Sequence, residues 1–410
     1  MKISVIGGGA SGMMAAITAA AAGVQTEILE SGPVLGKKIL STGNGRCNLT
    51  NASLDPALYQ GSGARIAAAL IKEFNVRDTV GFFDKIGIPT VAAASARGND
   101  SWIYPACKEA SAVRKALELE CERLGVSILT DHKVISVEKF EKEFVITTRE
   151  GVRFVSDRVI LTTGGKAFPK SGSDGSGYEL AAAFGHSIVS PLPALGALIS
   201  DSALCPSLAG IRSDAIVSLI VNRSIAAEET GEVQFTEYGL SGIPVFQISS
   251  RAVRALTEGK QVTVRINLIP AWKLNDLYLK LSERKVRRGL HESGTLLLGL
   301  VPDKMVPTLL KLAGIRLHIP CSEISRDALM KLAYNLQNLE FEINDAKDFD
   351  ACQVTSGGIP ASEVSLNLES LKVRGLYFAG EILDVDGPCG GYNLQWAWTS
   401  GWKAGSEAAK

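Results

Sequence analysis

The sequence predicts an α/β fold in which a domain built on a doubly wound parallel sheet is interrupted by an insertion. Three observations predict it. A strand, a glycine loop, a helix and a second strand occupy the first 30 or so residues, a similar strand, loop and helix close the chain, and the pattern in between changes character near residue 190. With 410 residues the chain is long enough for two or three domains.

The amino-terminal unit consists of four short segments. Lys2–Ile6 has the pattern of a buried strand, and Gly7–Gly12 is a glycine loop. Ser11–Ala22 is an alanine-rich helix that ends at Gly23, and Val24–Glu30 is a second strand. A strand, crossover helix and strand of this length is the unit from which parallel sheets are built.

The glycine loop has the spacing Gly7-x-Gly9-x-x-Gly12. Gly7 permits a tight turn, Gly9 lets the backbone approach a diphosphate, and Gly12 lets the helix pack closely on the strand. Free N–H groups at the start of the helix favour the charge of the phosphates. Glu30 ends the second strand, where a carboxylate can accept hydrogen bonds from ribose hydroxyls. The sequence therefore predicts a dinucleotide site.

The middle of the chain divides by its periodicity. Helices are predicted over 65–74, 77–86, 109–124 and 178–184, and strands with a period of two over 126–163. Prolines and strand-like runs then indicate a mostly β insertion, followed by helical patterns. We predict a nucleotide-binding domain at 1–190 and 352–410, a β insertion at 191–271 and 337–351, and a helical subdomain at 272–336.

Three features favour FAD over NAD as the dinucleotide. A long loop over 36–51, rich in glycine and amide residues, suits an extended ligand. The strand ending in Thr163–Gly165 brings bare backbone towards the first glycine loop. The carboxyl-terminal strand ends in Gly380 and Glu381, where a carboxylate can bond the ribityl chain that NAD lacks.

The turn Gly390–Leu394 opens the last helix of the chain. Its free N–H groups are placed to face the flavin pyrimidine ring, where reduced flavin carries negative charge, and such a helix dipole contributes about 0.3–2 kcal/mol. A second dinucleotide fingerprint is missing from the sequence. NADH or NADPH is therefore expected to visit the flavin only transiently, unless the substrate itself donates the electrons.

Four segments resemble the signatures of the HI0933-like flavoproteins: GGGASGMMAA, GKKILSTGNGRCNLTN, TTGGKAFPKSGSDGSGY and FAGEILDVDGPCGGYNLQWAWTSG. That group includes proteins described as aminoacetone oxidases and BaiN-type bile-acid reductases. The resemblance covers essentially the whole chain. It implies a Rossmann-like, glutathione-reductase-like FAD-binding domain interrupted by a small β-barrel and a helical subdomain, but it does not fix the substrate. Cys389 stands where a threonine is expected.

The predicted cofactor-binding residues come from the motifs and from the resemblance together. The motifs give the glycine loop, the acidic ends of two strands and the bare backbone beside them, and the resemblance implies further contacts from the long loop and one later strand. The full set is Gly7, Gly9, Ala10, Ser11, Gly12, Glu30, Ser31, Lys38, Gly45, Arg46, Asn48, Val134, Thr163, Gly164, Gly165, Gly380, Glu381, Gly391, Tyr392, Asn393 and Leu394.

No catalytic acid or base follows from the sequence. Cys47 and Cys389 lie in loops expected near the cofactor and are the candidates for a reactive thiol, with packing or backbone positioning as the alternative. Trp398 and Trp402 share one face of the last helix and are interpreted as core rather than as a platform for substrate. The four histidines are dispersed and predict no metal site.

Charge and cysteine usage limit the partners. With 43 basic and 43 acidic residues the net charge is zero, so neither nucleic acid nor membrane is an expected partner. The basic cluster at 284–288 is interpreted as a solvated helix face. Seven scattered cysteines without C-x-x-C spacing indicate a reducing, cytoplasmic compartment, and no segment has the pattern of a signal peptide. The oligomeric state stays open.

We therefore expect an FAD-dependent oxidoreductase that moves a hydride between a small organic substrate and flavin, with NAD(P)H as electron donor. An aminoacetone-type amine oxidase that uses O₂ is one alternative. A flavin-dependent tRNA-modifying enzyme is another, and it needs a basic surface. The remaining alternative is a flavin carrier without catalytic activity.

Overall fold

The computed structural model describes residues 1–94 and 101–410, which form two compact units. The first unit comprises Met1–Ala194 and Phe349–Lys410, and the second comprises Leu195–Asp348. The edges of the first unit lie within four residues of the predicted split at 190 and 352. The β and helical insertions together make up the second unit.

A five-stranded, all-parallel sheet forms the centre of the first unit, in the order β20-β10-β1-β2-β6. The predicted α/β, Rossmann-like fold is thereby confirmed. Central strands of such a sheet are buried on both faces and are mostly apolar, as in KISVI and RVIL, whose buried Ser4 donates a hydrogen bond to Glu27. The strands are β1 (Lys2–Ile6), β2 (Gln25–Leu29), β6 (Ser127–Leu129), β10 (Arg158–Leu161) and β20 (Leu376–Phe378).

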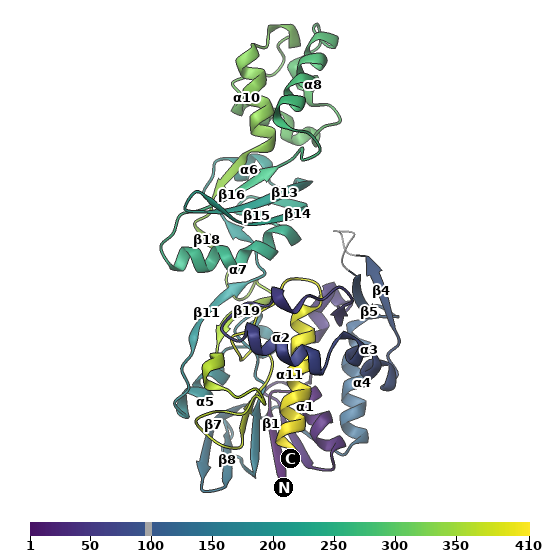
Figure 1. Ribbon diagram of the computed structural model, residues 1–410, viewed down its shortest axis with the longest axis vertical. Helices are drawn as coiled ribbons and strands as arrows, with labels where there is room; N and C mark the ends of the chain where they lie inside the picture. Colours follow the sequence, from purple (N-terminus) through teal and green to yellow (C-terminus); the bar gives the residue numbers. More distant parts are fainter. Residues whose placement is uncertain (95–100) are drawn as a thin grey trace. The chain divides into compact units, whose positions relative to one another are not determined.

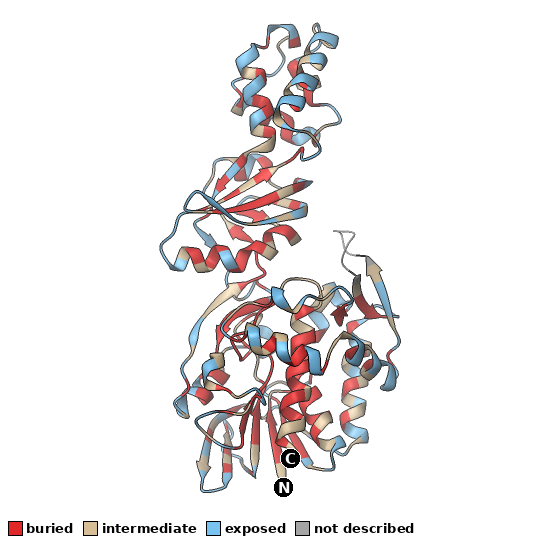
Figure 2. Ribbon diagram, in the orientation of Figure 1, coloured by how far each residue is buried: buried red, intermediate tan, exposed pale blue. Residues whose placement is uncertain are grey.

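Helix α1 (Ala10–Ala21) connects β1 to β2 and packs against α11 (Tyr392–Ala408), the last helix of the chain (Figure 1). A Cβ added to Gly401 would lie 2.4 Å from the carbonyl oxygen of Ser11, and one added to Gly405 would lie 2.3 Å from that of Ala15. The two helices therefore touch backbone to backbone and run parallel. Figure 2 shows how deeply both are buried.

The other elements of the first unit surround this core. The predicted helices are present, shifted by one or two residues, as α2 (Ala64–Glu73), α3 (Val76–Lys85), α4 (Ala110–Arg123) and α5 (Ser176–Ala183). The predicted meander is the sheet β7 (Val134–Phe140), β8 (Glu143–Thr148) and β9 (Arg153–Ser156). Two small antiparallel sheets were not predicted: β3 (Thr50–Asn51) with β5 (Ser101–Pro105) and β4 (Thr90–Ala94), and β11 (Val189–Ala194) with β19 (Val354–Gly358).

The second unit contains a seven-stranded sheet in the order β17-β16-β13-β14-β15-β12-β18. All its pairings are antiparallel. The end strands β17 and β18 are separated by only two residues, and Ile343 N donates to Val262 O in β16 at 2.9 Å while Asn344 N donates to Ile199 O in β12 at 3.0 Å. One continuous segment thus pairs with both edges of the sheet and closes it, which agrees with the implied barrel. Its strands are β12 (Leu198–Ile199), β13 (Arg212–Val221), β14 (Ser224–Thr236), β15 (Gly239–Ser241), β16 (Val262–Asn267), β17 (Leu339–Glu342) and β18 (Asp345–Ala346).

Helices of the second unit fall into two groups. The predicted helical subdomain contains α8 (Leu274–Arg287), α9 (Val306–Leu312) and α10 (Arg326–Gln337). The short α6 (Leu204–Leu208) and the long α7 (Ile243–Thr257) contact the sheet, and α7 was missed from the sequence. Its β-branched residues have weak helix propensity, but Val245, Ile248 and Ala252 lie on one helical face that packs against the sheet and stabilises the helix.

The basic cluster of α8 is engaged within its own subdomain. Arg284 donates to the carbonyl oxygens of Leu296 and Leu298 at 3.1 and 2.9 Å, and Lys285 donates to that of Ile324 at 2.5 Å. Arg288 donates to Thr295. The interpretation of 284–288 as a solvated face is therefore wrong for three of its four basic residues. These three donate hydrogen bonds to carbonyl oxygens that the short helical turns leave without a backbone partner.

Among the described residues, none of the helices is both long enough and apolar enough to cross a bilayer. In the same parts of the chain, the His, Cys, Asp and Glu side chains form no group of three or more that could hold a metal ion.

Candidate cofactor site

The glycine loop between β1 and α1 has the geometry that its sequence predicts. Gly7 has a φ of +105°, which favours glycine, and a Cβ on Gly12 would lie 1.9 Å from the carbonyl oxygen of Gly7. A Cβ on Gly9 would instead meet nothing within 4 Å. The helix start has no side-chain cap and no acidic residue in its first turn. Its N–H groups thus face open space suited to a diphosphate.

Glu30 lies directly after β2 and holds the loops around it. One carboxylate oxygen accepts from the N–H of Gly8 at 2.8 Å, and the other accepts from Gly32 N at 2.8 Å and Ser31 Oγ at 3.1 Å. His132 donates its backbone N–H to Glu30 O at 2.8 Å, and two residues later Val134 begins β7. The structure therefore brings the predicted residues Glu30, Ser31 and Val134 to one end of the site.

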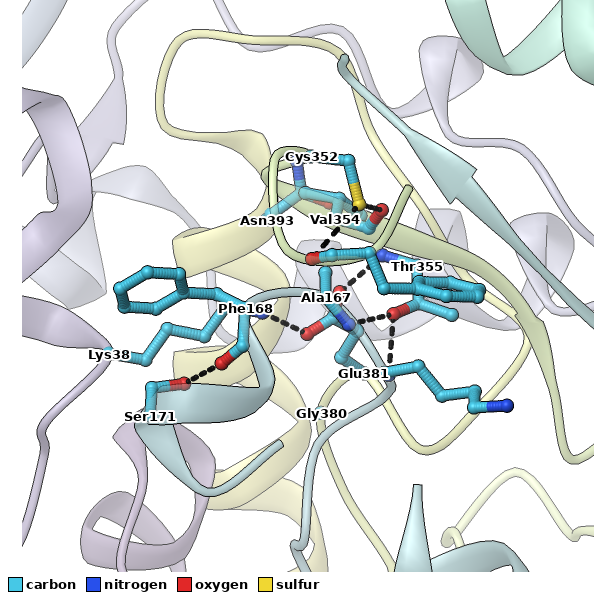
Figure 3. A network of polar contacts seen from close by, with 12 residues as sticks. Lys38, Ala167, Phe168, Ser171, Cys352, Val354, Thr355, Gly380, Glu381 and Asn393 are labelled. Atoms are coloured by element: carbon cyan, nitrogen blue, oxygen red, sulfur yellow. Dashed lines mark hydrogen bonds and ion pairs between the residues drawn. The ribbon is translucent and has the colours of Figure 1, made fainter. Parts of the chain in front are cut away.

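A polar network connects the end of β20 with the long loop that follows β2 (Figure 3). Glu381 accepts from Lys38 Nζ at 2.7 Å and from the backbone N–H of Thr355 at 2.5 Å. The Thr355 hydroxyl accepts in turn from the N–H groups of Lys166 and Ala167 at 2.8 and 2.9 Å. The network thus joins four segments of the chain, and predicted residues Lys38 and Glu381 meet in it.

Thr355 was not predicted from the sequence. It is 1% exposed, and a Cβ added to Gly165 would lie 2.3 Å from its hydroxyl oxygen. No spacing signal marks it, because its partners at 165–167 and 381 come from other parts of the chain. Gly164 has a φ of +75°, and a Cβ there would lie 2.5 Å from Ser173 Oγ. The loop after β10 is therefore shaped by close packing on both sides.

Thr355→Val is expected to lower FAD affinity about tenfold while leaving the fold intact. Valine has the same shape but leaves two buried N–H groups, of Lys166 and Ala167, without an acceptor, at a cost of about 1–3 kcal/mol. Titration of the apoprotein with FAD, followed by flavin fluorescence, measures the change. Thr355→Ser keeps the hydroxyl and should bind FAD with wild-type affinity. If the valine variant binds FAD as tightly as the wild type, the network does not have the role given to it.

The turn that opens α11 is pressed against β3 and β5. Gly390 and Gly391 have φ values of +107° and +92°, and a Cβ on Gly391 would lie 2.5 Å from the backbone of Thr50. With its amide group in the orientation that satisfies both neighbours, Asn48 accepts from Gly391 N at 3.2 Å and donates to Thr50 O at 2.9 Å. Asn393 accepts from Gly387 N at 2.9 Å. The helix start has no side-chain cap.

Helices α1 and α11 run parallel, but their amino-terminal ends lie at different levels along the shared axis direction. Because Gly401 faces Ser11, the start of α11 at Tyr392 lies nine residues beyond that level, or about 14 Å at 1.5 Å per residue. A diphosphate over α1 and a ring over α11 would be separated by a distance that an extended ribityl chain can bridge. The residues present therefore fit FAD.

The remaining residues of the turn and its surroundings are mostly structural. Tyr392 is 5% exposed, and its hydroxyl accepts from the N–H of Asp55 at 3.0 Å. Trp396 and Trp398 are buried and donate to the carbonyl oxygens of Gly380 at 3.2 Å and Leu49 at 3.0 Å. Trp402 stacks on Phe74. The interpretation of these tryptophans as packing residues agrees with their contacts. Leu394 packs against the core.

The two candidate thiols have different surroundings. Cys47 is 0% exposed, and burial raises the pKa of its thiol to about 12 despite a hydrogen bond with Thr42. The thiol is therefore protonated at neutral pH, which disfavours a nucleophile. Cys389 is half-buried next to Gly390, with its sulfur 4.0 Å from Gln353 Oε1. Burial therefore removes support from Cys47 as a catalytic group, whereas Cys389 stays a candidate.

A buried histidine lies outside the cofactor site. His186 Nδ1 is 2.8 Å from Glu363 Oε2, and its Nε2 is 2.7 Å from Ser370 Oγ. The arrangement has the order of a hydrolase triad, which the sequence did not indicate. However, Ser370 is 6% exposed, and its hydroxyl accepts from the N–H groups of Lys372 and Val373 at 3.1 and 2.9 Å. The group therefore stabilises a turn.

This network predicts that the first unit loses stability as the pH falls. Burial lowers the pKa of His186 below 6.5, so unfolding takes up a proton once the pH drops below that value. Burial opposes ionisation of Glu363, yet hydrogen bonds from Ser187 and Lys372 hold its pKa at about 2, so stability falls further between pH 4.5 and 2. After allowance for solvent screening we expect a loss of about 1–2 kcal/mol between pH 7 and pH 4.

Urea unfolding at pH 7, 5.5 and 4 measures the effect, with Glu363→Gln as the matched variant. The variant should be less stable at pH 7 and should lose less stability on acidification, since glutamine has no carboxylate to protonate. Parallel pH profiles for the two proteins would contradict the assignment.

Solved structures with a similar fold come from flavin- and steroid-related enzymes. The 3-ketosteroid-Δ4-(5α)-dehydrogenase of Rhodococcus jostii is 15% identical with a TM-score of 0.52, and the match covers 100% of this chain and 96% of that one. A flavocytochrome c3 fumarate reductase is 14% identical with a TM-score of 0.51, covering 100% and 78%. At this identity the likeness concerns the fold alone. The fold defines the class, a Rossmann-like α/β protein whose glycine loop and helix starts leave room for a dinucleotide.

Sequence comparison places the chain more narrowly. The family model described as "HI0933-like protein Rossmann domain" matches residues 1–407, and the chain belongs to this family. A 3-dehydro-bile acid delta(4,6)-reductase of Clostridium scindens is 42% identical over 100% of this chain and 99% of its own length. A ribosomal RNA dihydrouridine synthase of Escherichia coli is 30% identical over 97% and 95%. The protein is thus an enzyme, an FAD-dependent oxidoreductase, as predicted.

Proposed function

We propose that the protein reduces a carbon–carbon double bond conjugated to a carbonyl group in a small organic substrate, with NAD(P)H as transient electron donor. The observation that carries the proposal is the 42% identity, over the full length of both chains, to a protein named 3-dehydro-bile acid delta(4,6)-reductase. That name describes a ketone conjugated to two double bonds. Uracil, the base that a dihydrouridine synthase reduces, likewise has its double bond next to a carbonyl group.

The cofactor supplies the hydride when bound, and the chain supplies its position and electrostatics. The open N–H groups at the start of α1 would hold the diphosphate, and Glu381, fixed by Lys38 and Thr355, would accept from the ribityl hydroxyls. The uncapped start of α11 would stabilise negative charge on the reduced ring by about 0.3–2 kcal/mol. Since 1.4 kcal/mol corresponds to about 30 mV for two electrons, this helix tunes the potential modestly.

The single parallel sheet supports NAD(P)H as a visitor rather than a resident. In the described parts of the chain the other four sheets contain only antiparallel pairs, so a second dinucleotide-binding fold does not accompany the first. The names of the two relatives both describe reductions, which favours a reductase over an amine oxidase using O₂. Half-reaction experiments identify the substrate and the preference for NADH or NADPH.

Anaerobic half-reactions test the proposal. The yellow protein should bleach on addition of NADH or NADPH, and a 3-oxo-Δ4 or 3-oxo-Δ4,6 steroid acid should restore the colour and gain two hydrogen atoms by mass spectrometry. The saturated ketone and the corresponding 3-hydroxy compound should not reoxidise the flavin. Reduction of the flavin by an added amine and its reoxidation by O₂, with no conjugated ketone reduced, would contradict the proposal.

A second candidate is reduction of a base in RNA, which the 30% identity to a ribosomal RNA dihydrouridine synthase favours. The surface argues against it: net charge is zero, and Arg284, Lys285 and Arg288 are engaged with carbonyl groups of their own subdomain. A gel shift with ribosomal and transfer RNA at moderate salt separates the two. A stable complex, together with dihydrouridine formation, would make RNA the substrate.

A further inference from the structure

The loop that follows β2 contains an unusual run of left-handed backbone. Gly43, Asn44, Gly45 and Cys47 have φ values of 56°, 56°, 80° and 57°. The two residues with side chains are strained in this conformation, by about 1–3 kcal/mol each, and such strain persists only where the surrounding structure enforces it. Here the buried Cys47 anchors the loop, and its N–H donates to Thr42 O at 3.0 Å.

This strained loop presents Arg46. Its Nε donates to the carbonyl oxygen of Gly43 at 3.2 Å, and its Cζ lies 5.3 Å above the ring of Tyr104, which is 3% exposed. The Arg46 side chain is exposed, and among the contacts recorded for the described residues none uses its two terminal nitrogens. The guanidinium is therefore held at two points, which lowers the entropy lost when its outer edge binds a ligand.

Arg46 lies beside the turn that opens α11. Tyr104 and Trp102 point to the same face of β5, with ring centroids 6.5 Å apart. The indole Nε1 of Trp102 lies 2.6 Å from where a Cβ on Gly390 would be. Asn48, two residues after Arg46, accepts from Gly391 N at 3.2 Å in its satisfied orientation. The arginine thus stands next to the place where the flavin ring is expected.

We propose that Arg46 binds the carbonyl oxygen of the conjugated ketone, rather than the cofactor as the family resemblance implies. This inference rests on the proposed function. A group next to the ring meets the reacting part of the substrate, and an arginine there remains a cation at every working pH. Its planar edge of N–H donors suits an oxygen that gains negative charge during the reaction.

The step balances with the partners already named. A hydride adds to the carbon β to the carbonyl, the electron pair of the double bond moves to form the enolate, and its charge rests on the oxygen beside Arg46. Water then protonates the α carbon, and the electron pair on oxygen re-forms the carbonyl. Two electrons and one proton come from NAD(P)H by way of the flavin, and one proton comes from water.

Arg46→Met tests the assignment, because methionine keeps a flexible stem but removes the charge. The holoprotein is titrated with a saturated 3-oxo steroid acid and with its 3-deoxy analogue, and the change in flavin absorbance reports binding. The wild type should bind the ketone about 10- to 100-fold more tightly than the deoxy compound. The variant should lose this preference, should reduce the conjugated ketone with a much lower kcat, and should retain FAD within about twofold, because its cofactor contacts are unchanged.

Arg77→Met is the matched control, since Arg77 is an exposed arginine on α3 of the same unit. It should behave as wild type in all three measurements. Loss of FAD from Arg46→Met would make Arg46 a cofactor residue and overturn the inference. An unchanged preference of the variant for the ketone over the deoxy compound would also overturn it. So would a loss of affinity for the steroid acid that is absent for its methyl ester, because Arg46 would then bind the carboxylate. If the wild type itself reduces no conjugated ketone, the proposed function fails first.

Discussion

Replacing Gly9 with valine is expected to give a folded but colourless protein. Gly9 has extended backbone angles, φ −76° and ψ −168°, which a β-branched residue adopts readily, and its added Cβ would meet no protein atom within 4 Å. The side chain would instead fill the space over the start of α1, where the diphosphate is proposed to lie. Losing one or two charge-assisted hydrogen bonds there should weaken FAD binding by about 100-fold or more.

Two measurements separate binding from folding in this variant. FAD titration of the apoprotein gives the affinity, and thermal unfolding of the apoprotein should differ from wild type by only a degree or two, since no packing is disturbed. Gly12→Ala provides the contrast, because its Cβ would lie 1.9 Å from Gly7 O and should destabilise the loop itself. A Gly9→Val protein that stays yellow with wild-type affinity would remove the diphosphate from this position.

Gly401→Ala is expected to destabilise the first unit by about 2 kcal/mol. In a free helix the change would be favourable by nearly 1 kcal/mol, but here the new Cβ would lie 2.4 Å from the backbone of Ser11 and force α11 away from α1. The start of α11 would move with it, so FAD should also dissociate faster. Urea unfolding followed by tryptophan fluorescence reports on this unit, since four of the five tryptophans lie in it.

Gly81→Ala is the matched control for this helix packing. Gly81 lies in α3, and a Cβ there would meet nothing within 4 Å, so the same substitution should stabilise the protein by about 0.5–1 kcal/mol. Opposite signs for the two variants would show that backbone contact, not helix propensity, decides the outcome. If both variants shift the urea midpoint in the same direction, the close approach of α1 and α11 does not limit stability.

Secondary structure was predicted well where the periodicity and capping residues lie within one short segment. The strand at 2–6 was predicted to the residue, and the helices at 65–74 and 77–86 differ from α2 and α3 by one residue at each end, because their capping and periodicity are local. The prediction failed at α7, whose β-branched residues are made helical by the sheet they cover. It also missed the strand pair β3–β5, since two residues such as Thr50–Asn51 carry no period.

The same division applies to the site. The amino-acid sequence by itself determined the glycine loop, the acidic residue after β2 and the first parallel strand pair with its crossover helix, because each depends on neighbours within about thirty residues. Only the tertiary structure decided that Glu381 meets Lys38 and Thr355, that Cys47 is sealed in the core, and that Arg46 projects beside α11. Those contacts join separate segments of the chain, 343 residues apart for Lys38 and Glu381, and their energy depends on packing that no local pattern records.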